Sequence, residues 1–544
     1  MKSSVSLFVL FIIVSQCGGL GCTENAGLPS KTEIDKLELK RGQLISCGAT
    51  EKQFGKADFE ISCAPSVKED FDLALELLHS FEYDESEKMF SRIIDKEPSC
   101  SMAFWGIAMC NLHLLWTAPS LAELQKGAKA IQIAKAHANP GSREAGYINA
   151  LGEYYKDWER TDPNARNEHF EKAMEKLSAS YPSDKEAAIF YALALIAAAD
   201  PADKSYKKQR RAGSILFAIY PSQPDHPGII HYIIHAYDYP GLAEQALPEA
   251  RKYASVAPSS AHALHMPSHI FTRLGLWDEC IQSNLASLAA AKCYARAAGI
   301  RGHWDEELHA MDYLVYAYLQ KGNNDMAKTQ VDSLLSIYDV YPVNFKVAYA
   351  FAAIPSRYML ENRKWHEAAS LKIYPADLPW NKFPWQEALI HFTRVLGAAQ
   401  TRQMDLGNVE LDILGKLYDT LESQRDFYKS RQVEIQLKAG QAWLLFKSGK
   451  KKEGLQLMTI AADMEDSTEK HPVTPGALIP ARELLGDMLM ESNQPKQALV
   501  AYEADLTNSP YRRNGLIGAS MAAKKSGDKN KAKRYLLMLV NIEK

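Results

Sequence analysis

The sequence predicts an all-α protein, a tetratricopeptide-like solenoid of helical pairs arranged in one or two sub-arrays. Three observations indicate this fold class. From Pro65 to the C-terminus, apolar residues recur at helical spacing, and alternating strand-like runs are scarce. Breaks at Gly, Pro or Asn recur about every 15–20 residues, as in stacked helical pairs. Near the C-terminus, Ala498 and Ala532 stand 34 residues apart with Pro510 between them, which matches the tetratricopeptide period and its terminal proline.

The first element, residues 1–22, is predicted to be a signal or lipoprotein peptide. Lys2 precedes an apolar run at residues 5–14, which is too short to span a membrane as a mature helix. Gly21-Cys22 is similar to the end of a bacterial lipobox, in which Cys22 would carry lipid. A lipoprotein and a plainly secreted protein both stay open. We therefore expect export to the periplasm, cell surface or medium, with membrane contact only through an N-terminal lipid or an uncleaved signal.

The second element, residues 23–64, is polar and is predicted to be an arm tethered to the first repeats by disulfides. An exported protein meets oxidising conditions. The first four of its cysteines lie within 64 residues and allow two disulfides in any of three pairings. The last two stand on one predicted helix, too far apart to pair with each other, and are expected to be buried apolar residues. The six cysteines are Cys47, Cys63, Cys100, Cys110, Cys280 and Cys293.

The remaining chain is predicted to form the helical array. Residues 65–374 would be an N-terminal sub-array with a histidine-rich centre, and residues 375–544 a C-terminal one. The proline-rich loop at residues 375–384 marks the boundary between them. Roughly ten to twelve helical pairs are expected, each of which buries its apolar face on its neighbours.

Composition narrows the expected partners. The chain has 63 basic and 66 acidic residues and a net charge of −3, which gives no electrostatic case for nucleic-acid binding. Phosphate-binding glycine loops, nucleophile elbows and dinucleotide fingerprints are absent from the sequence. We therefore expect a protein, peptide or small-molecule ligand in the concave groove of the array, and no nucleic acid.

Several segments resemble exported bacterial tetratricopeptide-repeat proteins over nearly the whole mature chain. The histidine phrases are specific, whereas the repeat phrases are generic. The resemblance implies the fold and export, and it carries no catalytic role. The segments are Cys63-Ala-Pro-Ser, Leu77-Leu-His-Ser-Phe81, Trp105-Gly-Ile-Ala-Met109, Asp225-His-Pro-Gly228, His231–Asp238, the His262–Phe271 segment His-Ala-Leu-His-Met-Pro-Ser-His-Ile-Phe, and Pro480-Ala-Arg-Glu-Leu-Leu-Gly486.

Histidine is concentrated in one part of the chain. Eight of the fifteen histidines fall between His226 and His309. His231 and His235 are four residues apart and share a helical face, the spacing with which two imidazoles grip one metal ion. Three successive inner helices of the array would present histidines towards the groove. Because packed helices lie about 8–10 Å apart, ligands from neighbours can converge on one ion.

These spacings predict a candidate metal site. Zinc, copper and iron all suit such ligands, and the sequence does not distinguish among them. The preferred ligands are His231, His235 and His265. A fourth-ligand, second-shell or proton-transfer role is assigned to Asp238, His262 and His309. Pro267 is expected to kink the helix or start a new turn, so that His269 would point elsewhere. His226 and His303 are set aside, and the segment Asp225-His226-Pro227 is expected to cap a helix, with Asp225 suited to the N-cap.

Three interpretations of the cluster stay open at this point. It is a metal or catalytic site, a structural network in which tyrosines such as Tyr232 and Tyr313 partner the histidines, or a groove that binds ligands through imidazoles. Two function classes follow. One is an exported repeat scaffold whose groove binds a peptide, protein or small ligand, with a metal as an added feature. The alternative is a metal-dependent enzyme whose site lies between residues 231 and 312.

Overall fold

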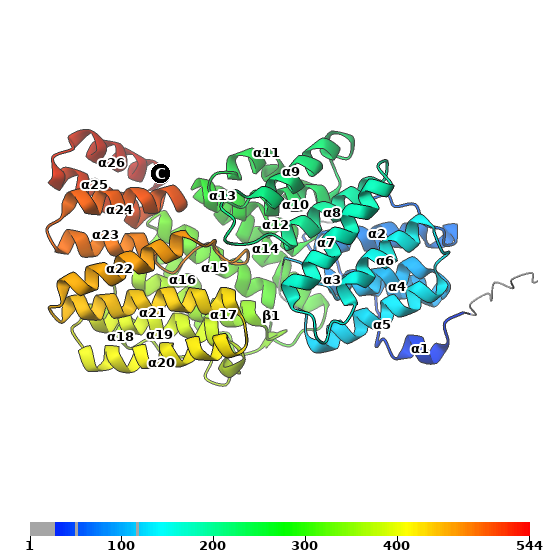
Figure 1. Cartoon of the computed structure of the whole chain (residues 1–544), viewed down its shortest axis with the longest axis horizontal. Helices are drawn as coiled ribbons and strands as arrows, with labels where there is room; N and C mark the ends of the chain where they lie inside the picture. Colours follow the sequence, from blue (N-terminus) through cyan, green and yellow to red (C-terminus); the bar gives the residue numbers. More distant parts are fainter. Residues whose placement is uncertain (1–27, 49–52, 116–118, 544) are drawn as a thin grey trace, which may run out of the picture.

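A computed structural model describes residues 28–48, 53–115 and 119–543. The predicted signal or lipoprotein peptide at residues 1–22 lies outside the described residues. The fold is all-α and built from consecutive helical hairpins, which confirms the predicted fold class (Figure 1). A single short parallel pairing joins β1 (His303–Trp304) to β2 (Val340–Tyr341) within the described chain. No helix of the described part is both long and apolar enough to cross a bilayer.

The helices of the first half begin in the arm and continue to the histidine-rich centre. They are α1 (Lys31–Asp35), η1 (Pro65–Val67), α2 (Lys68–His79), α3 (Tyr83–Lys96), α4 (Ser101–Cys110), α5 (Leu121–His137), α6 (Arg143–Tyr155), α7 (Pro163–Ser180), α8 (Lys185–Ala197), α9 (Lys207–Ile219), η2 (Tyr220–Ser222), α10 (Pro227–Tyr237), η3 (Ala243–Ala246), α11 (Leu247–Val256), α12 (Ala261–His265), α13 (Pro267–Leu274) and α14 (Trp277–Ala297).

The helices of the second half follow β1 and run to the C-terminus. They are α15 (Asp305–Gln320), α16 (Asn324–Leu335), α17 (Phe345–Glu361), α18 (Trp365–Ala369), η4 (Trp380–Lys382), α19 (Pro384–Gln400), α20 (Met404–Ser423), α21 (Phe427–Lys447), α22 (Lys451–Asp466), α23 (Ala481–Glu491), α24 (Pro495–Asn508), α25 (Arg513–Ser526) and α26 (Lys529–Glu543).

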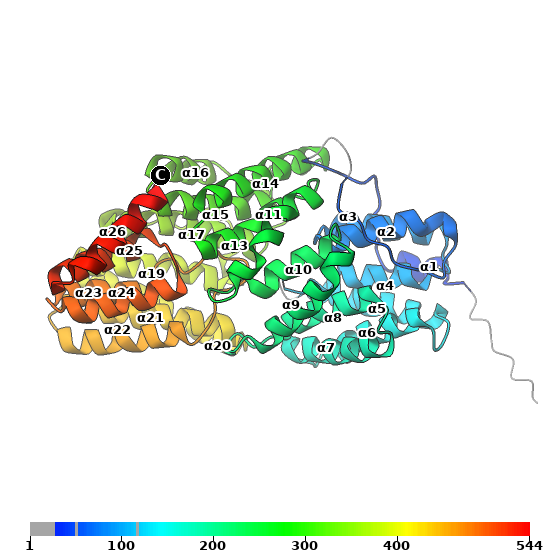
Figure 2. The same cartoon turned by 90° about the horizontal axis from the view of Figure 1, so that it is seen from above.

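The packing pattern is that of a solenoid. From α2 onward each α-helix contacts the next one along the chain, and alternate helices such as α2 and α4, α4 and α6, or α15 and α17 also contact each other. Figure 2 shows the resulting row of hairpins from above. The expected boundary at residues 375–384 is a loop containing η4, and α18 and α19 contact each other across it. One apolar core runs through the helices on both sides of this loop.

The C-terminal repeats turn back onto the centre of the chain. α25 contacts α15, and the backbone N–H of Arg513 donates to the side-chain oxygen of Gln320 at 2.8 Å. The segment at residues 467–480, between α22 and α23, reaches the histidine-rich region through Lys470, which lies 2.7 Å from Asp238. The centre of the array is therefore enclosed by helices and by this segment.

The arm is tied down by two disulfides, Cys47–Cys293 and Cys63–Cys100, with Cα–Cα distances of 5.9 and 5.3 Å. The first pairing corrects the expectation that Cys293 is a buried apolar residue and that the first four cysteines pair among themselves. The arm crosses α14, so Cys47 meets a partner 246 residues away, a proximity that local spacing does not encode. Cys110 stays a buried thiol, as does Cys280.

Candidate metal centre

Six buried histidines from four helices form two adjacent triads. Triad A joins His231 and His235 on α10 to His262 on α12. Triad B joins His265 on α12 to His269 on α13 and His309 on α15. Within each triad, one ligand atom of each histidine lies within 4.8 Å of the others. All six rings are buried, and the most exposed, His235, is only 7% accessible. The histidines therefore face the interior of the array, which corrects the expectation of an open groove.

Local sequence explains how these helices present their rings. His226 caps α10, because its Nδ1 accepts from the backbone N–H of Ile229 at 3.3 Å, and Pro227 occupies the first turn. The helix start expected at this segment is confirmed, with His226 rather than Asp225 as the N-cap residue. From this start, His231 and His235 fall one turn apart on one face. Their rings lie 4.8 Å apart, centroid to centroid.

The break between α12 and α13 does not redirect the chain. Met266 keeps right-handed helical angles (φ −52°, ψ −37°), so Pro267 opens α13 as a first-turn proline. His265 and His269 consequently stay one turn apart on the same side. The expectation that Pro267 turns His269 away is wrong, since a proline at the start of a helix removes no hydrogen bond that the helix needs.

The tautomers in triad A follow from the outer hydrogen bonds. His231 Nδ1 lies 2.6 Å from the backbone carbonyl oxygen of His79, which can only accept, so Nδ1 carries the proton. His231 Nε2 then presents a lone pair. His235 Nε2 approaches it at 3.1 Å and His262 Nε2 at 3.2 Å. One lone pair accepts one well-formed hydrogen bond, so two ring nitrogens compete for it.

In triad B, the outer hydrogen bonds fix the tautomers of two histidines. Asn284 donates its amide to the carbonyl of Cys280 at 2.8 Å, so its oxygen faces His265 Nδ1 at 2.6 Å and accepts that proton. His269 Nδ1 donates to the carboxylate of Asp238 at 3.1 Å. Both Nε2 atoms therefore carry lone pairs and lie 3.1 Å apart, and the hydroxyl of Tyr313 lies 3.5 Å from the Nε2 of His269.

Burial keeps these rings neutral. Desolvation lowers the pKa of His231 to about 3. Desolvation also lowers the pKa of His269, and the smaller raising effect of the Asp238 carboxylate does not cancel it. The same cause holds the pKa of the other four histidines well below the ordinary value. A proton shared as imidazolium thus does not resolve the contact between lone pairs in triad B. Neutral imidazole is the form that binds metals.

The two triads adjoin each other. The rings of His235 and His269 lie 6.0 Å apart, and those of His262 and His265 lie 6.2 Å apart. Rings within a triad are 4.3–5.1 Å apart for the pairs His231–His262, His265–His269 and His265–His309. The six rings therefore form one continuous cluster, His231, His235, His262, His265, His269 and His309, which we call the histidine bowl.

Asp238 lies behind the bowl rather than in it. Its carboxylate contacts His269 Nδ1, Arg273 Nε at 2.8 Å and Lys470 Nζ at 2.7 Å. Burial alone would raise the pKa of Asp238, but Lys470 and Arg273 hold it well below its ordinary value. Asp238 therefore contacts the outer nitrogen of His269 and does not face the other histidines, which is the position that a carboxylate behind a metal-binding ring would take.

The triads differ in membership from the predicted ligand set. His231 and His235 meet His262, which was given a secondary role, whereas His265 lies with His269 and His309. The reason is the rotation of α12. His262 and His265 share one face of α12 but differ by about 60° around its axis, so His262 meets His231 of α10 and His265 meets His309 of α15.

A third buried cluster lies next to triad A and contains His79, Glu186 and His226. His79 Nε2 and His226 Nε2 each donate to a different oxygen of Glu186, at 3.1 and 2.5 Å. Tyr232 donates its hydroxyl to His79 Nδ1 at 2.9 Å. Every ring nitrogen has a partner of opposite type, so we call this the closed cluster. Sequence reasoning missed Glu186 and His79, which lie far from the histidine-rich stretch in sequence.

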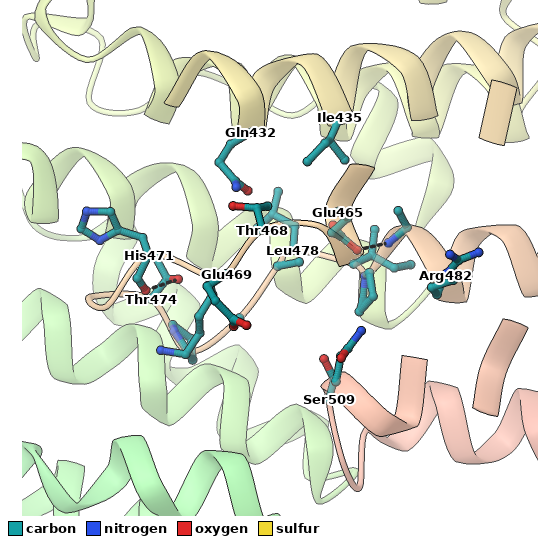
Figure 3. Close-up of a pocket in the computed structure, with 18 of the residues that line it drawn as sticks. Gln432, Ile435, Glu465, Thr468, Glu469, His471, Thr474, Leu478, Arg482 and Ser509 are labelled. Atoms are coloured by element: carbon teal, nitrogen blue, oxygen red, sulfur yellow. Dashed lines mark hydrogen bonds between the residues drawn. The ribbon is translucent and has the colours of Figure 1, made fainter. Parts of the chain in front are cut away.

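A cleft with a cavity volume of about 140 Å³ lies between the two halves of the array (Figure 3). The segment at residues 467–480 lies along it, with Gln432 and Ile435 of α21 on the other side. The aromatic rings of Trp385 and Tyr428 line the cleft beside His471, and their centroids lie 5.5 and 5.8 Å from the centroid of its ring. Arg273 and Lys470, which hold Asp238, are also part of its lining.

Comparisons with known proteins do not identify a family. No protein-family model and no curated protein matches the chain. Among solved structures, a monomeric mutant of IFIT1 with Gppp-AAAA is 12% identical, covering 94% of this chain and all of that chain with a TM-score of 0.34. The human IFIT1 dimer with m7Gppp-AAAA is 11% identical, covering 86% and 94% with a TM-score of 0.33. Likeness at this level carries no inference about a ligand, and the exclusion of nucleic acid stays a prediction.

Proposed function

We propose that this chain is an exported metalloprotein whose buried histidine bowl binds transition-metal ions. The observation that carries the proposal is triad B. His265 and His269 direct two unprotonated Nε2 atoms at each other across 3.1 Å, while both Nδ1 protons are committed outward. Facing lone pairs repel each other, and a cation between them turns that repulsion into two bonds.

The spacing supports this proposal. A tetrahedral ion with bonds of about 2.0–2.1 Å to nitrogen holds two ligand atoms roughly 3.3 Å apart. The closest contacts in both triads, 3.1 and 3.2 Å, lie near that value. In triad A a ring N–H of His235 or His262 can donate to His231 at these distances, whereas in triad B both Nδ1 protons are committed to Asn284 and Asp238.

The outer hydrogen bonds support it as well. Metal-binding histidines characteristically donate their second ring N–H to a carbonyl or carboxylate, which fixes the tautomer and orients the ring. His231 donates to a backbone carbonyl, His265 to an amide oxygen and His269 to a carboxylate. Three of the six rings thus show the orientation expected of ligands.

The cleft supports a second role, which is binding of a small ligand beside the metal centre. Its wall includes Arg273 and Lys470, whose charges contact Asp238, and Asp238 contacts His269. Two residues would therefore separate a ligand in the cleft from the His269 ring. This arrangement fits both a ligand-binding scaffold and a metal-dependent enzyme.

Export is supported by the disulfides. Two bridges tie the arm to the repeats, and such bridges persist in oxidising compartments. The expected signal peptide or lipid-bearing Cys22 remains part of the proposal. N-terminal mass analysis of the mature protein distinguishes a lipidated Cys22 from a simple cleavage.

Elemental analysis of protein purified without chelator tests the proposed function. Wild-type protein should carry a stoichiometric transition metal, and His265→Ala should reduce the amount bound. The matched control is His226→Gln, which alters an equally buried histidine of the closed cluster. Wild-type protein that stays metal-free after incubation with zinc, copper and iron salts would overturn the proposal.

A further inference from the structure

The number of ligands in the bowl exceeds what one ion needs. Each triad brings three ring nitrogens within 4.8 Å of one another, which is the usual count of protein ligands at a metal site with an open position. The two triads share no member and are joined edge to edge through His235–His269 and His262–His265. The geometry therefore offers two separate but adjacent sites.

Charge limits which ions can fill both sites. All six candidate ligands are imidazoles buried in the protein interior. The carboxylate nearest to the bowl among the contacts above, Asp238, faces Nδ1 of His269 and is already paired with Arg273 and Lys470. Two divalent ions would bring four positive charges with no anionic ligand in either triad, and buried uncompensated charge is costly. Two monovalent ions bring half that charge.

Ligand type and coordination point the same way. Paired iron sites in helical proteins draw on bridging and terminal carboxylates, and hard ions prefer oxygen ligands. The triads contain nitrogen alone. Imidazole suits copper as well as zinc, iron and nickel, so the lower charge of copper(I) is what favours it over divalent ions when both triads are filled.

We infer that the bowl holds a pair of copper(I) ions, one in triad A and one in triad B. The inference rests on the proposed function, since it names the metal and the number of ions at the same centre. Triad A would use His231, His235 and His262, and triad B the other three histidines. Asn284 and Asp238 would orient two of the ligands of triad B.

The test is an anaerobic titration of metal-free protein with copper(I) against a chromogenic copper(I) chelator. Wild-type protein should bind two equivalents. His235→Ala and His269→Ala should each retain one, and the double variant should retain none, a loss of at least about 100-fold in affinity at each altered triad. His226→Gln should bind two equivalents like wild type. Zinc(II) at equal concentration should not displace the copper.

The outcomes separate this inference from the proposed function. One equivalent in wild type, zinc displacing copper, or loss of both ions from each single variant would overturn the copper pair while leaving a metal centre in place. No binding of any metal would overturn both. X-ray absorption of the copper-loaded wild type, which needs no variant to fold, should show about three nitrogen neighbours for each copper. A set of oxygen or sulfur neighbours would contradict the assignment.

Discussion

The closed cluster and the histidine bowl lie side by side in the same core, yet their hydrogen bonding differs in kind. In the closed cluster, Glu186 lies between two imidazoles and accepts from both, and Tyr232 donates to the remaining nitrogen of His79. In triad B, two imidazoles meet nitrogen to nitrogen with no carboxylate between them. The two regions even share a residue, because the backbone carbonyl of His79 accepts from His231.

This difference teaches that burial and histidine content do not by themselves mark a metal site. Both regions are buried, and both could be grouped by distance alone. What separates them is whether the donors and acceptors are complementary. A complete network stabilises the apo protein, whereas a bowl of facing lone pairs is stabilised by a cation.

The largest expected effect is stabilisation by metal. At a free copper(I) concentration of about 1,000 times Kd, one site adds about 4 kcal/mol to the free energy of unfolding. Anaerobic thermal unfolding measures it. His226→Gln should gain as much on copper addition as wild type, although it starts from a lower stability. A copper-induced gain that disappears in His226→Gln would mean that the closed cluster, not the bowl, binds the ion.

The next effect compares truncations in the two regions of the metal-free protein. His226→Ala removes the cap of α10 and one partner of buried Glu186, and should cost about 3 kcal/mol. His235→Ala leaves no unpaired buried carboxylate and no uncapped helix, and should cost less, about 1 kcal/mol. Urea unfolding measures both. Equal costs would indicate that the bowl is a satisfied structural network.

A smaller effect is expected from the second shell. Asp238→Asn weakens the acceptor that orients His269, and should reduce copper affinity at triad B about 10–100-fold, with triad A unchanged. Competition with the chelator measures each site. Asp225→Asn is the control, because Asp225 pairs with Lys252 on the surface. Unaltered affinity at both triads would remove Asp238 from the metal centre.

The smallest effect concerns pH and belongs to the closed cluster. Burial alone would raise the pKa of Glu186, but His226 and His79 hold it well below its ordinary value of 4.5. A lowered carboxyl pKa contributes stability above the unfolded value and loses it as pH falls. Stability should therefore decline below pH 4.5, by about 1 kcal/mol less in Glu186→Gln. Measurement is by urea unfolding from pH 6 to pH 3, and parallel curves for both proteins would refute the assignment.

Much of the fold could be predicted from the sequence because helical spacing and breaks are local signals. The 34-residue separation of Ala498 and Ala532 predicts the repeat, and the structure contains the hairpins. The Cys47–Cys293 bridge could not be predicted in the same way. It depends on the path of the arm over α14, which is set by packing at a sequence separation of 246.

The candidate site was predicted in part. The four-residue spacing of His231 and His235 correctly placed both rings on one face, because that spacing is a property of a single helix. The third member of this triad was not predicted correctly. Whether His262 or His265 joins His231 and His235 depends on how α12 is rotated between two other helices, which the sequence does not encode locally. His269 was set aside on Pro267, although a proline in the first turn leaves the helix direction intact.

The most direct measurement of the central claim is anomalous X-ray scattering from crystals loaded with copper(I) under anaerobic conditions. Data collected on both sides of the copper absorption edge should show two peaks. One should be bounded by His231, His235 and His262, the other by His265, His269 and His309, with none at Glu186. A bowl without an anomalous peak, or a peak only in the closed cluster, would contradict the account.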